Sequence, residues 1–215
     1  CADSTKLRTP MRRKPDPEQR RLELCDAAIT LLAEEGIKGL SHRKVDRAAG
    51  VPDGTTSFNF RTLAALVHAV AARVAALDLE ELTKATADSP AAGDGDKLGV
   101  SGLARLIMRS STGPPLIRSR ARLELVLQSH RDVILAEAFR DSGELFLALH
   151  RDVVLRLQPS GVEIEPARID EHAYVLQTFI GGLMSAIAYG DSTIESAEQL
   201  DGIMSAIVSG LSSRR

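Results

Sequence analysis

The sequence predicts an all-α fold, and three observations support that prediction. Apolar residues recur at the three- and four-residue spacing of helices along almost the whole chain. No segment alternates apolar and polar residues long enough for a strand, and the nearest candidate, SGVEIEP at 160–166, is short and ends in proline. Glycine and proline breaks divide the 215 residues into segments of ordinary helix length, which gives room for one large or two small helical domains.

The composition is that of an ordinary soluble protein, with 44% hydrophobic and 26% charged residues. The longest weakly polar stretch, 63–77, contains His68 and Arg73 and is shorter than the roughly 20 apolar residues of a membrane span. No apolar signal core follows the basic start of the sequence, so we expect a cytoplasmic protein without a membrane partner. Cys1 and Cys25 supply neither a disulfide framework nor a zinc site.

No catalytic or metal-binding motif stands out in the sequence. Four of the five histidines, at 68, 130, 150 and 172, are separated by 62, 20 and 22 residues and lack the i, i+4 spacing of helical metal ligands. There is no glycine-rich phosphate loop, no G-x-S-x-G and no paired Cys and His. We therefore expect no catalytic residues, no metal and no cofactor, and we do not expect an enzyme.

Charge is unevenly distributed along the chain. The first 75 residues carry 13 basic and 9 acidic side chains, a formal charge of +4, whereas the remaining 140 carry 14 and 20, a formal charge of −6. A basic end binds phosphates favourably through counterion release, and an acidic remainder is turned away from a duplex. The asymmetry is modest and supports nucleic-acid binding only in combination with a motif.

A basic arm precedes the first predicted helix. Residues 1–15 are polar and basic, and we expect them to be flexible. Asp16, Pro17 and Glu18 then predict a helix start, because they combine an N-cap residue, a proline at the first position and an acid in the first turn. Gly36 predicts the end of this helix. Its apolar face consists of Leu24, Ala27, Ala28, Leu31 and Leu32.

Two short helices follow, joined by a tight break. Ser41 is expected to cap the first, and Gly50 is expected to end it in a left-handed conformation. The second is predicted to begin at Pro52 and to end near Phe60. We expect its inner face to consist of Val51, Phe58 and Phe60, and its small polar outer face to consist of Thr55, Thr56, Ser57 and Asn59.

Longer helices are predicted for the rest of the chain, the first of them capped by Thr62. The breaks divide the sequence into a helix-turn-helix domain at 16–62, a connecting helix at 63–87, a linker loop at 88–97 and a larger helical domain at 98–215. Within the larger domain we expect helices at about 98–111, 116–158, 167–189 and 194–211. The second of these is one helix or two, with a joint at 129–132.

Two short helices with a glycine-containing turn of about four residues, and a longer helix behind them, are typical of a helix-turn-helix DNA reader. The second short helix must enter a major groove about 12 Å wide, which favours the small polar side chains found on its outer face. Gly54 lets the backbone approach a phosphate, and the helix N-terminus offers N–H groups of the right polarity. Asp46 is expected at the rim, paired with Arg43 or Arg47.

Residues 20–70 resemble the amino-terminal domain of the TetR (tetracycline repressor) family of transcriptional regulators. The resemblance lies in the alanine-rich first helix, the segment LSHRKVDRAAGV, the reading helix GTTSFNF and the helix that follows. It implies a homodimeric repressor that binds a double-stranded DNA operator and whose C-terminal helices bind a small molecule that weakens DNA binding. The alternative is a helical ligand-binding or protein-interaction module without sequence-specific DNA binding, and an unrecognised helical enzyme is a more distant one.

The resemblance also implies which residues contact DNA. Arg43 is the best candidate for a guanine contact, and Asn59 stands where the family often has histidine. Two positions depart from the family pattern, because Ser57 replaces a usual tyrosine and Leu63 replaces a frequent phosphate-binding lysine. We expect the basic arm or Arg61 to compensate for both. The full set of expected DNA contacts is Ser41, His42, Arg43, Asp53, Gly54, Thr55, Thr56, Ser57, Asn59 and Arg61.

The last two predicted helices are rich in small residues, which allow close helix approach and favour a four-helix dimer interface. The expected interface residues are Leu176, Ile180, Gly181, Leu183, Ile187, Ile203 and Ile207. The alternative is that these helices pack only within their own chain. A dimer would set two reading helices roughly 34–36 Å apart and would require a near-palindromic operator.

A cavity for an unknown small-molecule effector is expected among the helices of the larger domain. Its expected lining is Met108, Leu125, Gln128, Phe139, Phe146, His150, Tyr174, Gln177 and Met184. The chain has no tryptophan and only 3% aromatic residues, which favours an aliphatic or small ligand over a flat multi-ring one. We expect the connecting helix to transmit ligand binding to the reading helix as a population shift.

Overall fold

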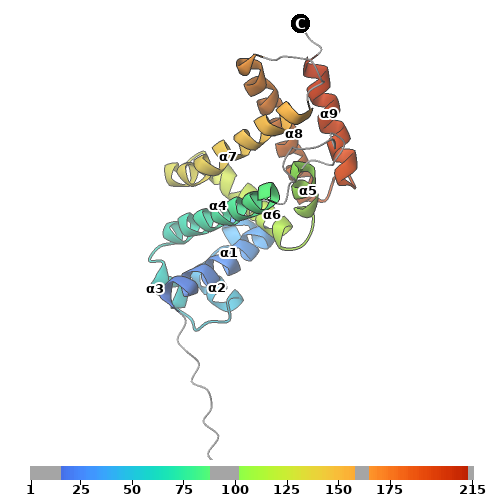
Figure 1. Cartoon of the computed structure of the whole chain (residues 1–215). Helices are drawn as coiled ribbons and strands as arrows, with labels where there is room; N and C mark the ends of the chain where they lie inside the picture. The colour runs from blue at the N-terminus through green and yellow to red at the C-terminus, as the bar shows by residue number, and fades with distance from the viewer. Residues whose placement is uncertain (1–15, 88–101, 158–164, 213–215) are drawn as a thin grey trace, which may run out of the picture.

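A computed structural model describes residues 16–87, 102–157 and 165–212 of the chain. Within these ranges every regular element is a helix, as the sequence predicts. The amino-terminal helices are α1 (Pro17–Gly39), α2 (His42–Ala48), α3 (Thr55–Asn59) and α4 (Leu63–Ala87). The remaining helices are α5 (Gly102–Arg109), α6 (Gly113–Ser129), α7 (Val133–Leu157), α8 (Pro166–Tyr189) and α9 (Ala197–Ser212). Figure 1 shows α1–α3 at one end of the molecule, α8 and α9 at the other, and α4 and α6 between them.

Most predicted helix signals act where the sequence places them. The carboxylate of Asp16 accepts a hydrogen bond from the backbone N–H of Glu18 (3.3 Å), and the hydroxyl of Ser41 accepts one from Lys44 (3.3 Å). Gly36 adopts a φ of 68° and kinks α1, although the helix resumes and continues to Gly39. The predicted arm at 1–15, the linker at 88–97 and most of the loop before α8 lie outside the described residues.

The start of α3 differs from the prediction. The helix begins at Thr55 rather than at Pro52, because residues 52–54 form a turn in which Gly54 has a φ of 91°. Only glycine adopts that left-handed conformation without strain. The joint at 129–132 is confirmed, and it separates α6 from α7.

The interior consists of two main apolar clusters. One joins α1, α2 and α4 to the central part of α6 and to the start of α7, and it includes Phe60 and Leu125. The other joins α5, α7, α8 and α9. Because α6 packs extensively on α1, the amino-terminal helices do not stand apart from the rest of the molecule but rest directly on α6.

Polar contacts fix α6 and α7 against the amino-terminal helices. The carboxylate of Glu124 in α6 accepts a hydrogen bond from the backbone N–H of Ile37 (3.2 Å), directly after the kink at Gly36. At the α6–α7 joint, Asp132 lies 2.8 Å from Nε2 of His68 in α4 and also caps the first turn of α7. The contact with His68 is the main reason why the pKa of Asp132 lies below its usual value.

Candidate functional site

The short helix α3 is fixed to α2 by the buried carboxylate of Asp46. This side chain is 1% exposed, and it accepts hydrogen bonds from the backbone N–H groups of Gly54 and Thr56 (both 2.7 Å) and from the hydroxyl of Thr56 (2.5 Å). The prediction of a rim residue paired with Arg43 or Arg47 is therefore wrong for Asp46. A carboxylate at the N-terminus of α3 satisfies N–H groups that have no partner inside the helix.

These contacts change the assignment of two predicted DNA contacts. Thr56 is fully buried, because its hydroxyl is turned towards Asp46, so its side chain cannot reach a base. The backbone N–H of Gly54 is also bound to Asp46 and is not available to a phosphate. The prediction that the side chain of Thr56 faces outward is thus wrong, and the N–H groups of Gly54 and Thr56 are not among the free donors expected at the N-terminus of this helix.

The other end of α3 is held by α1. The guanidinium of Arg21 donates a hydrogen bond to the backbone carbonyl of Asn59 (2.6 Å) and lies 4.4 Å from the ring centroid of Phe60. Phe60 itself is 2% exposed and belongs to the core, as predicted. A helix of five residues has little stability of its own, so these contacts at both ends determine its position.

The outward face of α3 includes a hydrophobic residue whose position in the sequence predicts a place in the core. Phe58 is 86% exposed, so the prediction that it anchors α3 to the domain is wrong. Ser57 is exposed beside it, whereas Thr55 and Asn59 are half-buried. The polar groups of Thr55, Ser57 and Asn59 donate hydrogen bonds to the backbone carbonyls of Pro52, Gly54 and Thr55, which orders the side chains.

The start of α2 lies beside this face. Arg43 is exposed, and its Nε lies 3.9 Å from the carboxylate of Asp53, which is equally exposed. An exposed pair at this distance contributes little and leaves the guanidinium free to bind another group. Ser41 is exposed and caps α2, whereas His42 is half-buried. Arg61 is exposed after α3, and Leu63 at the start of α4 is 41% exposed.

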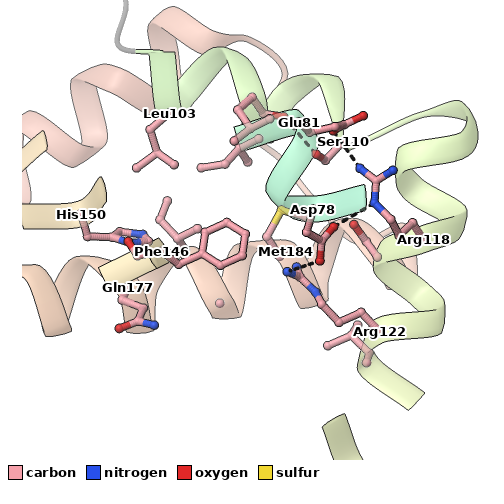
Figure 2. Close-up of a pocket in the computed structure, with 16 residues that line it drawn as sticks. Asp78, Glu81, Leu103, Ser110, Arg118, Arg122, Phe146, His150, Gln177 and Met184 are labelled. Atoms are coloured by element: carbon pink, nitrogen blue, oxygen red, sulfur yellow. Dashed lines mark hydrogen bonds and ion pairs between the residues drawn. The ribbon is translucent and has the colours of Figure 1, made fainter. Parts of the chain in front are cut away.

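A second candidate site is a cavity between α4, α5, α6, α7 and α8, with a volume of about 210 Å³ (Figure 2). Its apolar walls include Leu103, Phe146, Ile180 and Met184. Charged side chains line the part of the cavity next to α4 and α6. Four of the predicted lining residues are brought together here, and they are Phe146, His150, Gln177 and Met184.

The charged side chains of the cavity form a closed network between α4 and α6. Arg118 donates to Asp78 and to Glu81, both at 2.8 Å, and Arg122 donates to the second oxygen of Asp78 at 3.3 Å. Arg122 also lies 5.6 Å from the ring centroid of Phe146. Asp78 and Arg118 are largely buried, so this network holds α4 against α6 in a setting where charges must be paired.

His150 is the buried titratable group at the other end of the cavity. Its side chain is 2% exposed, and its Nδ1 lies 2.5 Å from the carbonyl oxygen of Phe146. Burial lowers the pKa of His150 below 6.5, and the carbonyl of Phe146 opposes this shift only in part. The imidazole is therefore neutral at pH 7.

The other predicted lining residues lie away from the cavity. Leu125 is fully buried in the cluster beneath α1, and Phe139 packs against that same cluster. Met108 packs against the cluster formed by α5, α7, α8 and α9, and Tyr174 is 67% exposed. Gln128 is half-buried near the end of α6.

The exposed face of α8 differs from the predicted dimer interface. Leu176, Ile180, Leu183 and Ile187 are buried within their own chain. The outward positions are Tyr174, Thr178, Gly181, Gly182, Ser185 and Tyr189. None of these six side chains is charged, and the hydroxyls of Thr178 and Ser185 donate to carbonyls of α8 itself. On α9, Gly202 and Ala206 are exposed, and Ile203 and Ile207 are half-buried.

Two further findings concern the described part of the chain. None of its helices combines the length and hydropathy that a membrane crossing requires. It contains no group of three or more His, Cys, Asp or Glu side chains arranged to hold a metal ion. Cys25 is buried in α1, and burial is the main reason why its pKa is raised to about 11.

Solved structures with the same arrangement of helices come from transcriptional regulators. A TetR-family member from Streptomyces coelicolor A3 has 26% sequence identity and a TM-score of 0.62 over 90% of this chain and 98% of that one. In its fold, the chain is similar to TetR-family proteins. A proposed transcriptional regulator from Pseudomonas aeruginosa PAO1 aligns over 94% of both chains, with 23% identity and a TM-score of 0.70.

A third similar structure is that of the multidrug binding protein EbrR in complex with ethidium. It has 24% identity and a TM-score of 0.60 over 91% of this chain and 99% of that one. No protein-family model matches the sequence. No curated protein sequence matches it either.

The sequence analysis did not predict the charged half of the cavity. Asp78 and Glu81 are three residues apart in α4, and Arg118 and Arg122 are four apart in α6. Each spacing places two like charges on one helix face, which is unfavourable unless another helix neutralises them. That pattern was the available signal for an interhelical ion cluster.

Proposed function

We propose that the chain is a ligand-responsive transcriptional regulator that binds a near-palindromic DNA operator as a homodimer, represses transcription, and is released by a small-molecule effector. The observation that carries this proposal is the construction of α3. A helix of five residues is fixed at one end by Asp46 and at the other by Arg21, and yet it presents Phe58 and Ser57 to solvent. The contacts at both ends hold the backbone of α3 in place, so its exposed side chains are presented in a fixed arrangement, as docking into a groove requires.

DNA reading would use the outward residues of α2 and α3. Arg43 offers a guanidinium that can bind guanine or a phosphate, because its only described pair is the long contact with Asp53. Phe58 can pack against thymine methyl groups in the major groove. Ser41, Asp53, Thr55, Ser57, Asn59 and Arg61, which are exposed or half-buried on α2, α3 and the adjoining turns, would complete the reading surface.

Dimerisation would use the outward faces of α8 and α9, of which the α8 face is uncharged from Tyr174 to Tyr189. Tyr174 and Tyr189 stand at the two ends of the α8 face, with glycines and Ser185 between them. Small residues in the middle let two helices approach closely, and tyrosines at the ends add apolar area with a polar edge. This assignment moves the proposed interface away from the leucine and isoleucine side chains that fill the core.

Effector binding in the cavity would reach the reading helix through α4 and α6. Asp78 in α4 and Arg118 in α6 are paired at the cavity wall, so a ligand that moves either helix moves both. The first turn of α4 directly follows α3, and Glu124 in α6 holds the backbone of α1 after Gly36. A ligand that favours one relative position of these helices would shift the population of the DNA-binding conformation.

The test measures binding of the full chain to the DNA upstream of its own gene by fluorescence anisotropy at several salt concentrations. We expect a sequence-specific complex that weakens as salt increases. Arg43→Ala should weaken the complex by roughly 1–3 kcal/mol. Arg156→Ala should leave it unchanged, because Arg156 is an exposed side chain in the last turn of α7, outside the proposed reading surface. Equal effects of the two substitutions would contradict the proposed reading surface. Binding to unrelated DNA with the same affinity would favour a protein-interaction module.

A further inference from the structure

The acceptor atom of His150 has no partner inside the protein. A backbone carbonyl only accepts hydrogen bonds, so Nδ1 of His150 carries the proton and donates to Phe146. Nε2 is then an unprotonated acceptor, and it is buried without a hydrogen-bond partner among the described residues. Buried polar atoms are almost always satisfied by protein, by water or by a ligand, and an unsatisfied one needs an explanation.

The charges of the cavity argue for an uncharged occupant. Asp78 and Glu81 are matched by Arg118 and Arg122 in one network, so the formal charges of these four side chains cancel. A charged ligand would lose its hydration and find no unpaired counter-charge, unless it broke one of these ion pairs. A neutral ligand leaves the network intact.

Size and lining restrict the occupant further. The cavity of about 210 Å³ is smaller than the roughly 300–1,000 Å³ of pockets that hold drug-sized ligands. It is larger than an apolar cavity of about 150 Å³, which holds a benzene molecule. Phe146, Ile180 and Met184 provide apolar walls for one ring or a short aliphatic chain.

We propose that the cavity binds a small uncharged hydroxyl compound of about the size of phenol, whose O–H group donates to Nε2 of His150. A hydroxyl suits this place better than an N–H group, because its oxygen can also accept from the carboxamide of Gln177, which lines the same cavity (Figure 2). His150 lines the cavity but its Nε2 is buried, so the ligand reaches this atom when a neighbouring side chain changes rotamer. This inference rests on the proposed role of the cavity as the effector site.

The test compares phenol with toluene, which has nearly the same shape but carries a methyl group in place of the hydroxyl. In an apolar cavity without an acceptor, toluene binds more tightly, because the hydroxyl of phenol loses its hydrogen bonds to water. We expect the opposite order for the full chain, with phenol bound about fivefold to tenfold more tightly than toluene in calorimetric titrations. His150→Leu should reverse this order, and Met184→Phe should weaken both ligands by filling the cavity.

A second readout does not depend on a variant that folds. In protein labelled with ¹⁵N at histidine, phenol should shift the Nε2 resonance of His150 in the direction of hydrogen bonding, and toluene should not. Toluene binding as tightly as phenol, no binding of either compound, or an unchanged Nε2 resonance in saturating phenol would overturn the proposal. If the full chain bound no DNA specifically in the anisotropy assay, the proposed function would be contradicted instead. The relative affinities for phenol and toluene would not depend on that result.

Discussion

The contacts of Asp46 predict that a substitution at this buried residue, which cannot itself touch DNA, disables α3, the proposed reading helix. In Asp46→Asn, the amide oxygen can still accept from Thr56, but the amide nitrogen replaces the oxygen that accepts from the N–H of Gly54. Two donors then face each other at the start of α3. Loss of one charge-assisted hydrogen bond lowers the free energy of unfolding by roughly 1.5–3 kcal/mol, and the unsatisfied N–H of Gly54 lowers it further. We expect the free energy of unfolding to fall by about 2–4 kcal/mol.

The assay is urea unfolding followed by circular dichroism, combined with the DNA anisotropy measurement. For the unfolding measurement, Asp53→Asn is the matched control, because Asp53 is an exposed carboxylate near the same helix whose only described pair is the weak one with Arg43. Thr56→Val removes only the hydroxyl donor and should cause a smaller loss of about 1–2 kcal/mol. If Asp46→Asn unfolded at the same urea concentration as the unsubstituted chain and bound DNA equally well, the account of how α3 is held would be refuted.

Two further predictions concern DNA contact and pH. Phe58→Ala should leave the free energy of unfolding within about 0.5 kcal/mol, because the ring is 86% exposed, but it should weaken specific DNA binding about tenfold in the anisotropy assay. A loss of stability without a loss of DNA affinity would contradict this role. Burial lowers the pKa values of His150 and His172 below 6.5, so the unfolded chain takes up protons at a higher pH than the folded chain. Stability should therefore fall as the pH drops below about 6.5, by at most about 1.4 kcal/mol per pH unit for each histidine. Urea unfolding at several pH values should show a smaller slope for His150→Leu, and an unchanged slope would contradict the assignment.

The sequence predicts the helices well, because long helices repeat their apolar pattern over several turns. An example is α8, a helix of 24 residues. Its start at Pro166 is predicted because proline is favoured in the first turn of a helix, and its long apolar repeat fits only a helix. The same reasoning fails for α3, because five residues contain no full period that could separate an inner from an outer face. Phe58 was therefore assigned to the core by its hydrophobicity alone, although the turn at Gly54 directs it outward.

The site residues that the sequence could not identify depend on contacts between distant segments. Asp46 and Thr56 are ten residues apart, and nothing in their local sequence shows that the turn brings them together. Leu125 was expected in the cavity, but α6 packs against α1 and places this side chain in the other cluster. The dimer residues raise the same difficulty, because Leu176 and Ile180 are hydrophobic whether they face a partner or their own core.

The most direct test of the proposed function is selection of bound DNA from a random pool with the purified full chain. The account predicts enrichment of one inverted repeat, whose half-sites lie about one helical turn or somewhat more apart, and loss of this enrichment in Arg43→Ala. A pool that remains random after selection, or an enriched motif that Arg43→Ala still selects equally well, would contradict it.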